Sequence, residues 1–198
     1  MEIVLLGRSN VGKSSVIRQL TGKKIPIGRR PGLTRRIDHY KVGRMEIVDM
    51  PGFGFMSGIS KTTREKKKTE IVKYIEQNRD RIILSLEVLD ARSFSEIAER
   101  WDDRGQVPID IEIFSFLQEL ELNPIVIVNK IDIIKKWDRN NVLDDICKRL
   151  GILPPWRQWF DVMVPISAKT GEGVPILKKL IKLKMHELGK GRLLGWLK

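Results

Sequence analysis

The chain has 198 residues and a formal net charge of +12, from 37 Lys and Arg against 25 Asp and Glu. Its length suits one domain with a full hydrophobic core, and it contains no apolar run near the roughly 18–20 residues that a membrane-spanning helix needs. Cys147 is the only cysteine, which excludes an intrachain disulfide and favours a reducing compartment. Because no secretory signal precedes the first predicted strand, we expect a cytoplasmic protein.

Strand-like and helix-like segments alternate along the chain, which is the pattern of a parallel sheet covered by helices. Residues 37–41 and 44–48 predict a hairpin that turns at Val42 and Gly43 and adds one antiparallel strand at the sheet edge. The sequence therefore predicts an α/β three-layer sandwich, with a mostly parallel six-stranded sheet and helices on both faces. The other strands are expected at residues 3–6, 81–89, 124–128 and 162–166, and helices at residues 13–20, 61–75, 110–120, 141–150 and 174–187.

A glycine-rich loop lies between the first predicted strand and the first predicted helix. Gly7 and Gly12 permit backbone conformations and a close approach that a Cβ would obstruct. The N–H groups of the loop and the start of the following helix can therefore converge on one bound anion. Lys13 is placed to reach the β- and γ-phosphates, and the Ser14 hydroxyl to bind Mg²⁺. We expect a nucleoside triphosphate to be bound by Gly7, Arg8, Ser9, Asn10, Val11, Gly12, Lys13, Ser14 and Ser15.

Two later loops indicate that the base is guanine. In the first, the Asp132 carboxylate can accept hydrogen bonds from guanine N1–H and N2 together; adenine lacks this donor pair, so discrimination can reach ~10⁴-fold. Asn129 is expected to contact the N7 side of the base and neighbouring loops, and the stem of Lys130 to cover the ring. A backbone N–H of the second loop, best placed at its central residue, is expected to donate to guanine O6. That loop consists of Ser167, Ala168 and Lys169.

Two further segments supply the expected Mg²⁺ ligands and the contact to the γ-phosphate. Asp49 ends a predicted strand and would hold Mg²⁺ through a water, while the N–H of Gly52 would sense the γ-phosphate. Thr34 lies between the phosphate loop and this motif, and we expect it to be the second hydroxyl ligand. The expected Mg²⁺ site is therefore formed by Ser14, Thr34 and Asp49.

These motifs resemble those of the TRAFAC class of GTPases and, within it, the EngB (YihA/YsxC) family. The resemblance covers residues 3–188, and its family-specific part rests on Arg8, Ser9, Asn10 and the P-G-F-G-F of residues 51–55. It implies a Ras-like P-loop fold and a GTP-hydrolysing switch that binds ribosomal RNA and assists assembly of the large subunit. Bacterial members usually have T-K-x-D in place of N-K-I-D and carry an N-terminal extension, so we expect a divergent, archaeal-type member.

Phe53 stands where Ras-like GTPases place the glutamine that orients the attacking water. Its ring cannot hydrogen-bond to water, so we expect slow intrinsic hydrolysis. In relatives with asparagine at the position of Asn10, its side-chain oxygen coordinates K⁺ near the bridging β–γ oxygen, and the resemblance implies stimulation by K⁺ through the same charge stabilisation. The alternative is that Asn10 only satisfies backbone groups of the loop. The expected catalytic residues are Lys13, Asn10, Thr34 and Gly52.

The positive charge is concentrated in three stretches, at residues 22–36, at residues 61–68 and in the last helix and tail. Each stretch also fits a solvated helix or loop face. Two of the three lie on segments that respond to the nucleotide, which favours RNA binding gated by GTP. No RNA-recognition module is present, so base-specific reading is not expected. The basic residues of the third stretch are Lys178, Lys179, Lys182, Lys184, Lys190 and Arg192.

Residues 91–108 form a longer connection than is usual between a strand and the next helix. Ser93 and Glu96 have the spacing of a capping box, which predicts an extra helix through Trp101. The segment fits either a partner-binding lid or a stabilising cover, and we favour the cover. Similarly, the aromatic residues of 154–160 fit an exposed anchor, although packing beneath a loop is the commoner use of tryptophan.

Two classes of function remain open from the sequence. The first is an enzymatic switch that binds ribosomal RNA in its GTP form and leaves after hydrolysis. The second is a GTP-gated adaptor for protein partners, such as those of cell division or septation, with little hydrolysis of its own. In both cases we expect residues 1–188 to form a single GTP-binding domain and residues 189–198 a basic tail.

Overall fold

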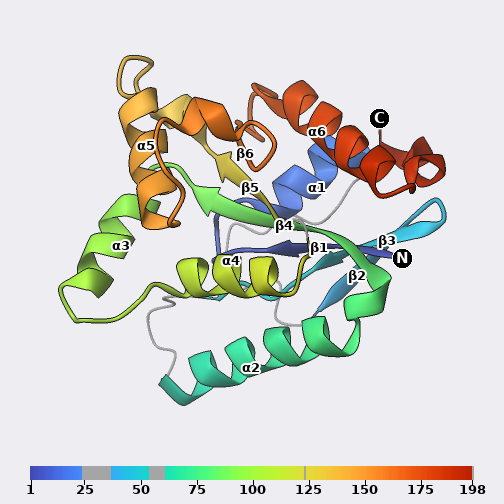
Figure 1. The fold of residues 1–198 in the computed structure, drawn as a ribbon, viewed down its shortest axis with the longest axis horizontal. Coiled ribbons are helices and arrows are strands. Elements are labelled where there is room, and N and C mark those ends of the chain that lie inside the picture. Colours follow the sequence, from blue (N-terminus) through green and yellow to red (C-terminus); the bar gives the residue numbers. More distant parts are fainter. Residues whose placement is uncertain (24–36, 54–60, 123, 198) are drawn as a thin grey trace.

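The computed structural model describes residues 1–23, 37–53, 61–122 and 124–197. Over these residues six strands form one sheet in the order β2-β3-β1-β4-β5-β6, in which only the β2–β3 pair is antiparallel (Figure 1). The predicted α/β sheet with one antiparallel edge strand is therefore confirmed. The strands are β1 (Glu2–Leu6), β2 (Asp38–Val42), β3 (Met45–Asp49), β4 (Ile82–Asp90), β5 (Pro124–Asn129) and β6 (Met163–Pro165).

Helices cover both faces of the sheet, as Figure 1 shows. Helices α1 and α6 pack on one face, whereas α2, α4 and α5 pack on the other. The described helices are α1 (Lys13–Thr21), α2 (Lys61–Gln77), α3 (Phe94–Asp102), α4 (Ile109–Glu119), α5 (Arg139–Arg149) and α6 (Val174–Glu187), and the short 3₁₀ helices are η1 (Arg79–Arg81), η2 (Ile131–Ile133), η3 (Trp156–Trp159) and η4 (Gly191–Trp196).

The central strand β1 explains why both faces need cover. Successive side chains of a strand point to opposite faces, and all five residues of β1 are buried. Ile3 and Leu5 pack in the cluster that includes α1 and α6, while Val4 and Leu6 pack in the cluster that includes α2 and α4. An apolar run without polar alternation therefore places β1 in the middle of the sheet, with the phosphate loop at its carboxyl end.

The hairpin turns one residue later than the sequence predicted. Val42 pairs with Met45, so the turn falls at Gly43 and Arg44 rather than at Val42 and Gly43. Gly43 has a φ of +61°, which glycine adopts at no steric cost. Val42 is buried in the core, and this burial fixes it as the last residue of β2.

The extra helix predicted between the fourth strand and the following helix is present as α3. Ser93 precedes it but forms no capping hydrogen bond through its side chain, so the predicted capping box is wrong. Instead, Phe94 and Ala98 are buried, and Arg149 of α5 pairs with Glu99 and Asp102. Hydrophobic packing and ion pairs to α5 therefore position α3, and its role as a cover stays a prediction.

Other aromatic and C-terminal residues also pack inward. Trp156 is buried and donates its indole N–H to Asn140 Oδ1 at 3.1 Å, which agrees with packing beneath a loop. After α6 the chain forms η4, whose Trp196 is buried in the core cluster with Leu197. The division of the chain at residue 188 stays a prediction. No helix in the described ranges is both long and apolar enough to cross a membrane.

Candidate nucleotide-binding site

The loop between β1 and α1 requires both of its glycines. Gly7 has a φ of +140°, and a Cβ there would lie 2.3 Å from the carbonyl oxygen of Val88. Gly12 has a φ of +100°, and a Cβ there would lie 2.3 Å from Asn129 Nδ2. The chain can therefore pass close to its neighbours only without side chains at these positions, which leaves the loop backbone compact at the start of α1.

Lys13 and Ser14 lie where the sequence places them, in the first turn of α1. The Lys13 ammonium donates to the carbonyl oxygens of Gly7 and Arg8 at 2.9 and 3.2 Å, so the side chain folds over the loop. The Ser14 hydroxyl donates to Asp49 Oδ2 at 3.3 Å, although the two residues are 35 apart in sequence. A hydroxyl and a carboxylate oxygen form a donor set that fits Mg²⁺. Ser15 is half-buried in the same turn.

The segment after β3 contacts the opposite side of the loop. The Ser9 N–H donates to the Phe53 carbonyl at 3.2 Å, and a Cβ on Gly52 would lie 2.6 Å from the Ser9 hydroxyl. Phe53 is only 2% exposed, and its ring packs with core residues of the α2 and α4 face. Thr34, the expected second hydroxyl ligand, lies outside the described residues.

Asn129 links the phosphate loop to the second guanine loop. Its amide Nδ2 donates to the Val11 carbonyl at 2.7 Å, and its Oδ1 accepts the Ala168 N–H at 2.9 Å. The side chain is 3% exposed, so both bonds are buried. The Ala168 N–H, which the sequence assigned to guanine O6, thus has a protein partner here, and its role toward the base stays a prediction.

The remaining residues of the two guanine loops surround this link. Lys130 has a φ of +65°, and its ammonium pairs with Asp90 Oδ2 at 2.5 Å at the end of β4. Asp132 is half-buried in η2. The Ser167 hydroxyl accepts the Thr170 N–H at 3.1 Å and stabilises the second loop, in which Lys169 is exposed.

The structure also reveals a charged cluster on the other flank of the phosphate loop. Arg8 is 7% exposed, and its Nε donates to the carboxylate of Asp110 at the start of α4. The guanidinium lies 6.0 Å from the ring centroid of Trp101 in α3. The sequence assigned Arg8 to the loop but did not reveal its partners. The signal in the sequence was Arg8 itself, a long cationic side chain directly after a buried strand. If such a side chain is buried, it requires an acidic partner from elsewhere in the chain.

Two buried carboxyl groups beneath this flank have altered acidity. Burial raises the pKa of Glu87 well above its ordinary value, and the nearby Asp110 raises it further. Burial also raises the pKa of Asp110, while the Arg8 guanidinium acts in the opposite direction. Among the described residues, neither carboxyl oxygen of Glu87 has a hydrogen-bond partner. Glu87 is therefore best accommodated as a neutral acid.

The assembled site is a phosphate loop with a Ser–Asp pair on one side and an N-K-x-D loop on the other, at the carboxyl ends of neighbouring parallel strands. The family model described as "50S ribosome-binding GTPase" matches residues 2–130. The probable GTP-binding protein EngB of Methanococcus maripaludis is 47% identical over 96% of this chain and 83% of its own length. The chain belongs to the EngB family of GTP-binding proteins.

Other comparisons agree with this assignment to the EngB family. The EngB protein of Methanopyrus kandleri is 48% identical over 95% of this chain and 94% of its own length. The crystal structure of a probable GTP-binding protein EngB superposes with a TM-score of 0.84 at 42% identity, covering 94% of this chain and 100% of that one. The EngB proteins of Methanococcus maripaludis and Methanopyrus kandleri are archaeal, in agreement with the expected archaeal type.

Proposed function

We propose that this EngB-family GTPase is a GTP-hydrolysing switch that assists assembly of the large ribosomal subunit through ribosomal RNA, in the cytoplasm. One observation carries the nucleotide-binding part of this proposal: Lys13, Asp49 and Asn129 come from three separate parts of the chain and contact the phosphate loop and the first turn of α1. The description of the matching family, a 50S ribosome-binding GTPase, supports the choice of partner.

At the phosphate end, we assign binding to the loop backbone of residues 7–14 and to Lys13. The ammonium of Lys13 now bonds to loop carbonyls and would transfer to phosphate oxygens when the triphosphate is bound. Ser14, Asp49 and Thr34 would hold Mg²⁺, which supplies charge neutralisation for the phosphates. The N–H of Gly52 would contact the γ-phosphate. A shift of Gly52 on this contact would also move Phe53, the next residue.

At the base end, we assign guanine recognition to Asp132, with Ala168 as the O6 donor and Lys130 and Lys169 beside the ring. Asn129 acts mainly as a positioning residue, because both of its amide atoms are used to join Val11 to Ala168. Ser167 supports the loop through its bond to Thr170. A GTP affinity equal to that for ATP would contradict this assignment.

We also propose slow intrinsic hydrolysis that K⁺ accelerates. Phe53 is buried and offers no hydrogen bond to a water, so another group must stabilise the transition state. Asn10 is exposed, with a φ of +69°, and its side-chain oxygen would hold K⁺, which supplies positive charge near the leaving oxygen. Turnover should rise in K⁺ relative to Na⁺, and Asn10→Ala should remove the difference. Equal rates in both salts would refute this part of the proposal.

The RNA surface that we favour is the exposed side of α6 and η4. Lys179, Lys182 and Arg192 are exposed there, and Glu187 is the only acidic residue of positions 174–198. Contacts between cations and phosphates release counterions, so binding should weaken steeply with salt. Lys179→Glu combined with Lys182→Glu should reduce binding to the large subunit, whereas Lys148→Glu on α5 is the matched control.

Sedimentation with purified large subunits tests the proposed function. The protein should cosediment with a non-hydrolysable GTP analogue more than with GDP, the complex should dissociate as salt rises, and subunits should raise GTP turnover. Binding that is equal in both nucleotides would refute a GTP-gated switch. GTP binding with neither subunit association nor stimulated hydrolysis would instead favour the adaptor, the alternative that the buried Phe53 keeps open.

A further inference from the structure

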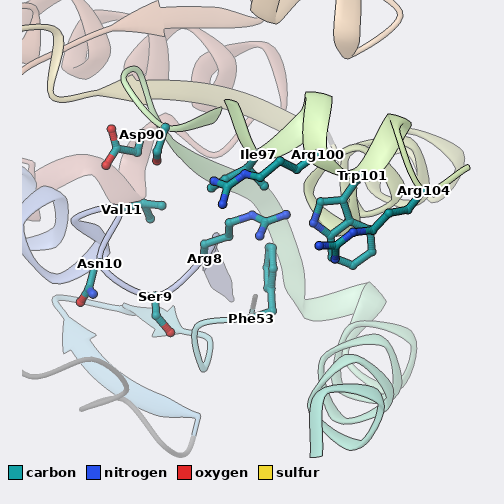
Figure 2. A pocket seen from close by; sticks show the side chains of 11 residues that line it. Arg8, Ser9, Asn10, Val11, Phe53, Asp90, Ile97, Arg100, Trp101 and Arg104 are labelled. Atoms are coloured by element: carbon teal, nitrogen blue, oxygen red, sulfur yellow. The ribbon is translucent and has the colours of Figure 1, made fainter. Parts of the chain in front are cut away.

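A cavity of about 290 Å³ lies between the phosphate loop, Phe53 after β3, and α3. Arg8, Phe53, Trp101 and Arg104 line it, together with Arg100 and residues of the loop. Figure 2 shows the Arg8 side chain extending from the phosphate loop toward the wall that α3 provides. The segment that we interpreted as a cover thus also forms one wall of a cavity beside the nucleotide site.

Basic side chains predominate among the charged residues that line the cavity. Three arginines line it, of which Arg8 is paired with Asp110, and Asp90, the one acidic residue among the described lining residues, is paired with Lys130. The α3 acids Glu96, Glu99 and Asp102 do not line the cavity, and the last two pair with Arg149 of α5. In the described part of the chain, no ion pair engages Arg100 or Arg104. The surplus of charge favours an anionic ligand.

Arg8 carries an unsatisfied donor in the wall of this cavity. Its Nε is held by Asp110, which fixes the plane of the guanidinium. Its Nη2 is buried and has no hydrogen-bond partner among the described residues, although the side chain is more than nine-tenths buried. A buried charged donor without an acceptor is costly, and a phosphate presents oxygens at the spacing of a guanidinium fork.

We propose that this cavity is a second binding site, which takes one nucleotide unit: its phosphate on Arg8, Arg100 and Arg104, and its base against Trp101. Aromatic rings beside arginines are the usual platform for an unpaired base. The volume is near the lower end of small-molecule sites, which start at about 300 Å³. It therefore admits a mononucleotide or one unpaired nucleotide of an RNA strand, and no larger portion of a folded RNA.

The site is connected to the state of the triphosphate. The Phe53 carbonyl accepts the Ser9 N–H at 3.2 Å, and Phe53 follows Gly52, the proposed γ-phosphate contact. A shift of Gly52 when GTP replaces GDP would move one wall of the cavity. We therefore expect different affinities for the second ligand in the two states, and by linkage the ligand changes the ratio of GTP to GDP affinity by the same factor.

The test uses the full chain with its triphosphate site saturated by GDP or by a non-hydrolysable GTP analogue. Uridine 5′-monophosphate, hexauridylate and inorganic phosphate are titrated separately by calorimetry. Wild-type protein should bind the first two, and inorganic phosphate more weakly because it lacks the base. The Arg100→Ala/Arg104→Ala variant should lose about ten-fold or more in affinity without a change in GDP affinity. Arg92→Ala, an exposed arginine outside the cavity, is the matched control.

The arms of the experiment identify the source of the nucleotide. Binding of hexauridylate above that of the monophosphate supports an RNA ligand, and the reverse supports a free nucleotide. Failure of both ligands to bind wild-type protein, or equal binding by the double arginine variant, overturns the proposal. Binding of an RNA nucleotide in this cavity rests on the proposed function, but the two can be refuted separately. A double variant that still cosediments with large subunits as the wild type does would overturn an RNA contact here while the GTP-gated switch stands.

Discussion

On the flank that faces β5, neutral hydrogen bonds hold the phosphate loop, whereas on the flank that faces α3 a buried charge holds it. Asn129 joins Val11 to Ala168 with both amide atoms used. On the other flank, Arg8 pairs with Asp110 and keeps Nη2 without a partner among the described residues. On the first flank the Asn129 amide already has its hydrogen-bond partners, whereas on the second flank Arg8 still has a donor that an anionic group could accept from. One side of the loop therefore fixes its place beside the guanine loops, and on the other side Arg8 can bind a further anionic group.

The largest effect is expected from Asp110→Ala, which removes the acid that holds Arg8. Breaking a buried ion pair by removing one partner leaves an uncompensated charge and costs about 3–5 kcal/mol. Urea unfolding should therefore show a large loss of stability. Glu112→Ala is the matched control: it lies in the same turn of α4 but pairs with Lys68 at the surface, where such pairs contribute about 0–1 kcal/mol. Equal losses in the two variants would contradict the buried role of Asp110.

A smaller loss is expected from Asn129→Ala on the opposite flank. Two buried hydrogen bonds disappear, and the unsatisfied groups of Val11 and Ala168 together cost about 2–4 kcal/mol. Because these groups are neutral, the loss of stability should be the same in acidic and neutral buffer. GTP affinity should fall as well, since the loop loses its link to the guanine end. Asn141→Ala, exposed on α5, should change neither quantity.

The smallest effect, and the one that depends on pH, is expected from Glu87→Gln. The folded chain keeps Glu87 protonated while the unfolded chain ionises it above its ordinary pKa of 4.5, so the wild type loses stability as pH rises beyond that value. Glutamine is neutral at every pH, so the variant lacks the pH dependence of stability that Glu87 causes. The variant should gain about 1.4 kcal/mol of stability relative to wild type for each pH unit above that value, which is on the order of 1 kcal/mol between about pH 5 and pH 6.

Thermal unfolding of wild type and Glu87→Gln across this range is the measurement for the pH effect. The gap between the two proteins should widen toward neutral pH. The neutral flank provides the internal comparison, because the deficit of Asn129→Ala should stay constant over the same range. A gap between Glu87→Gln and wild type that is constant with pH would mean that Glu87 is ionised in the folded protein.

Sequence reasoning predicted the neutral flank better than the charged one. Asn129 belongs to a motif with a fixed order after a strand, so its presence beside the phosphate loop follows from the parallel sheet. The ion pair of Arg8 joins residues 102 apart, and it depends on how α4 lies against β4, which no local spacing encodes. The Ser93 capping box failed for a related reason: Phe94, Ala98 and the ion pairs to Arg149 position α3.

The most direct test of the difference between the flanks is hydrogen–deuterium exchange of the full chain with GDP and with a non-hydrolysable GTP analogue. The base is the same in both ligands, so amides near Asn129 and Ala168 should exchange equally. The γ-phosphate differs, so exchange should change at Ser9, at Phe53 and in α3. Changes confined to the base end, or an α3 that exchanges identically in both states, would contradict the account.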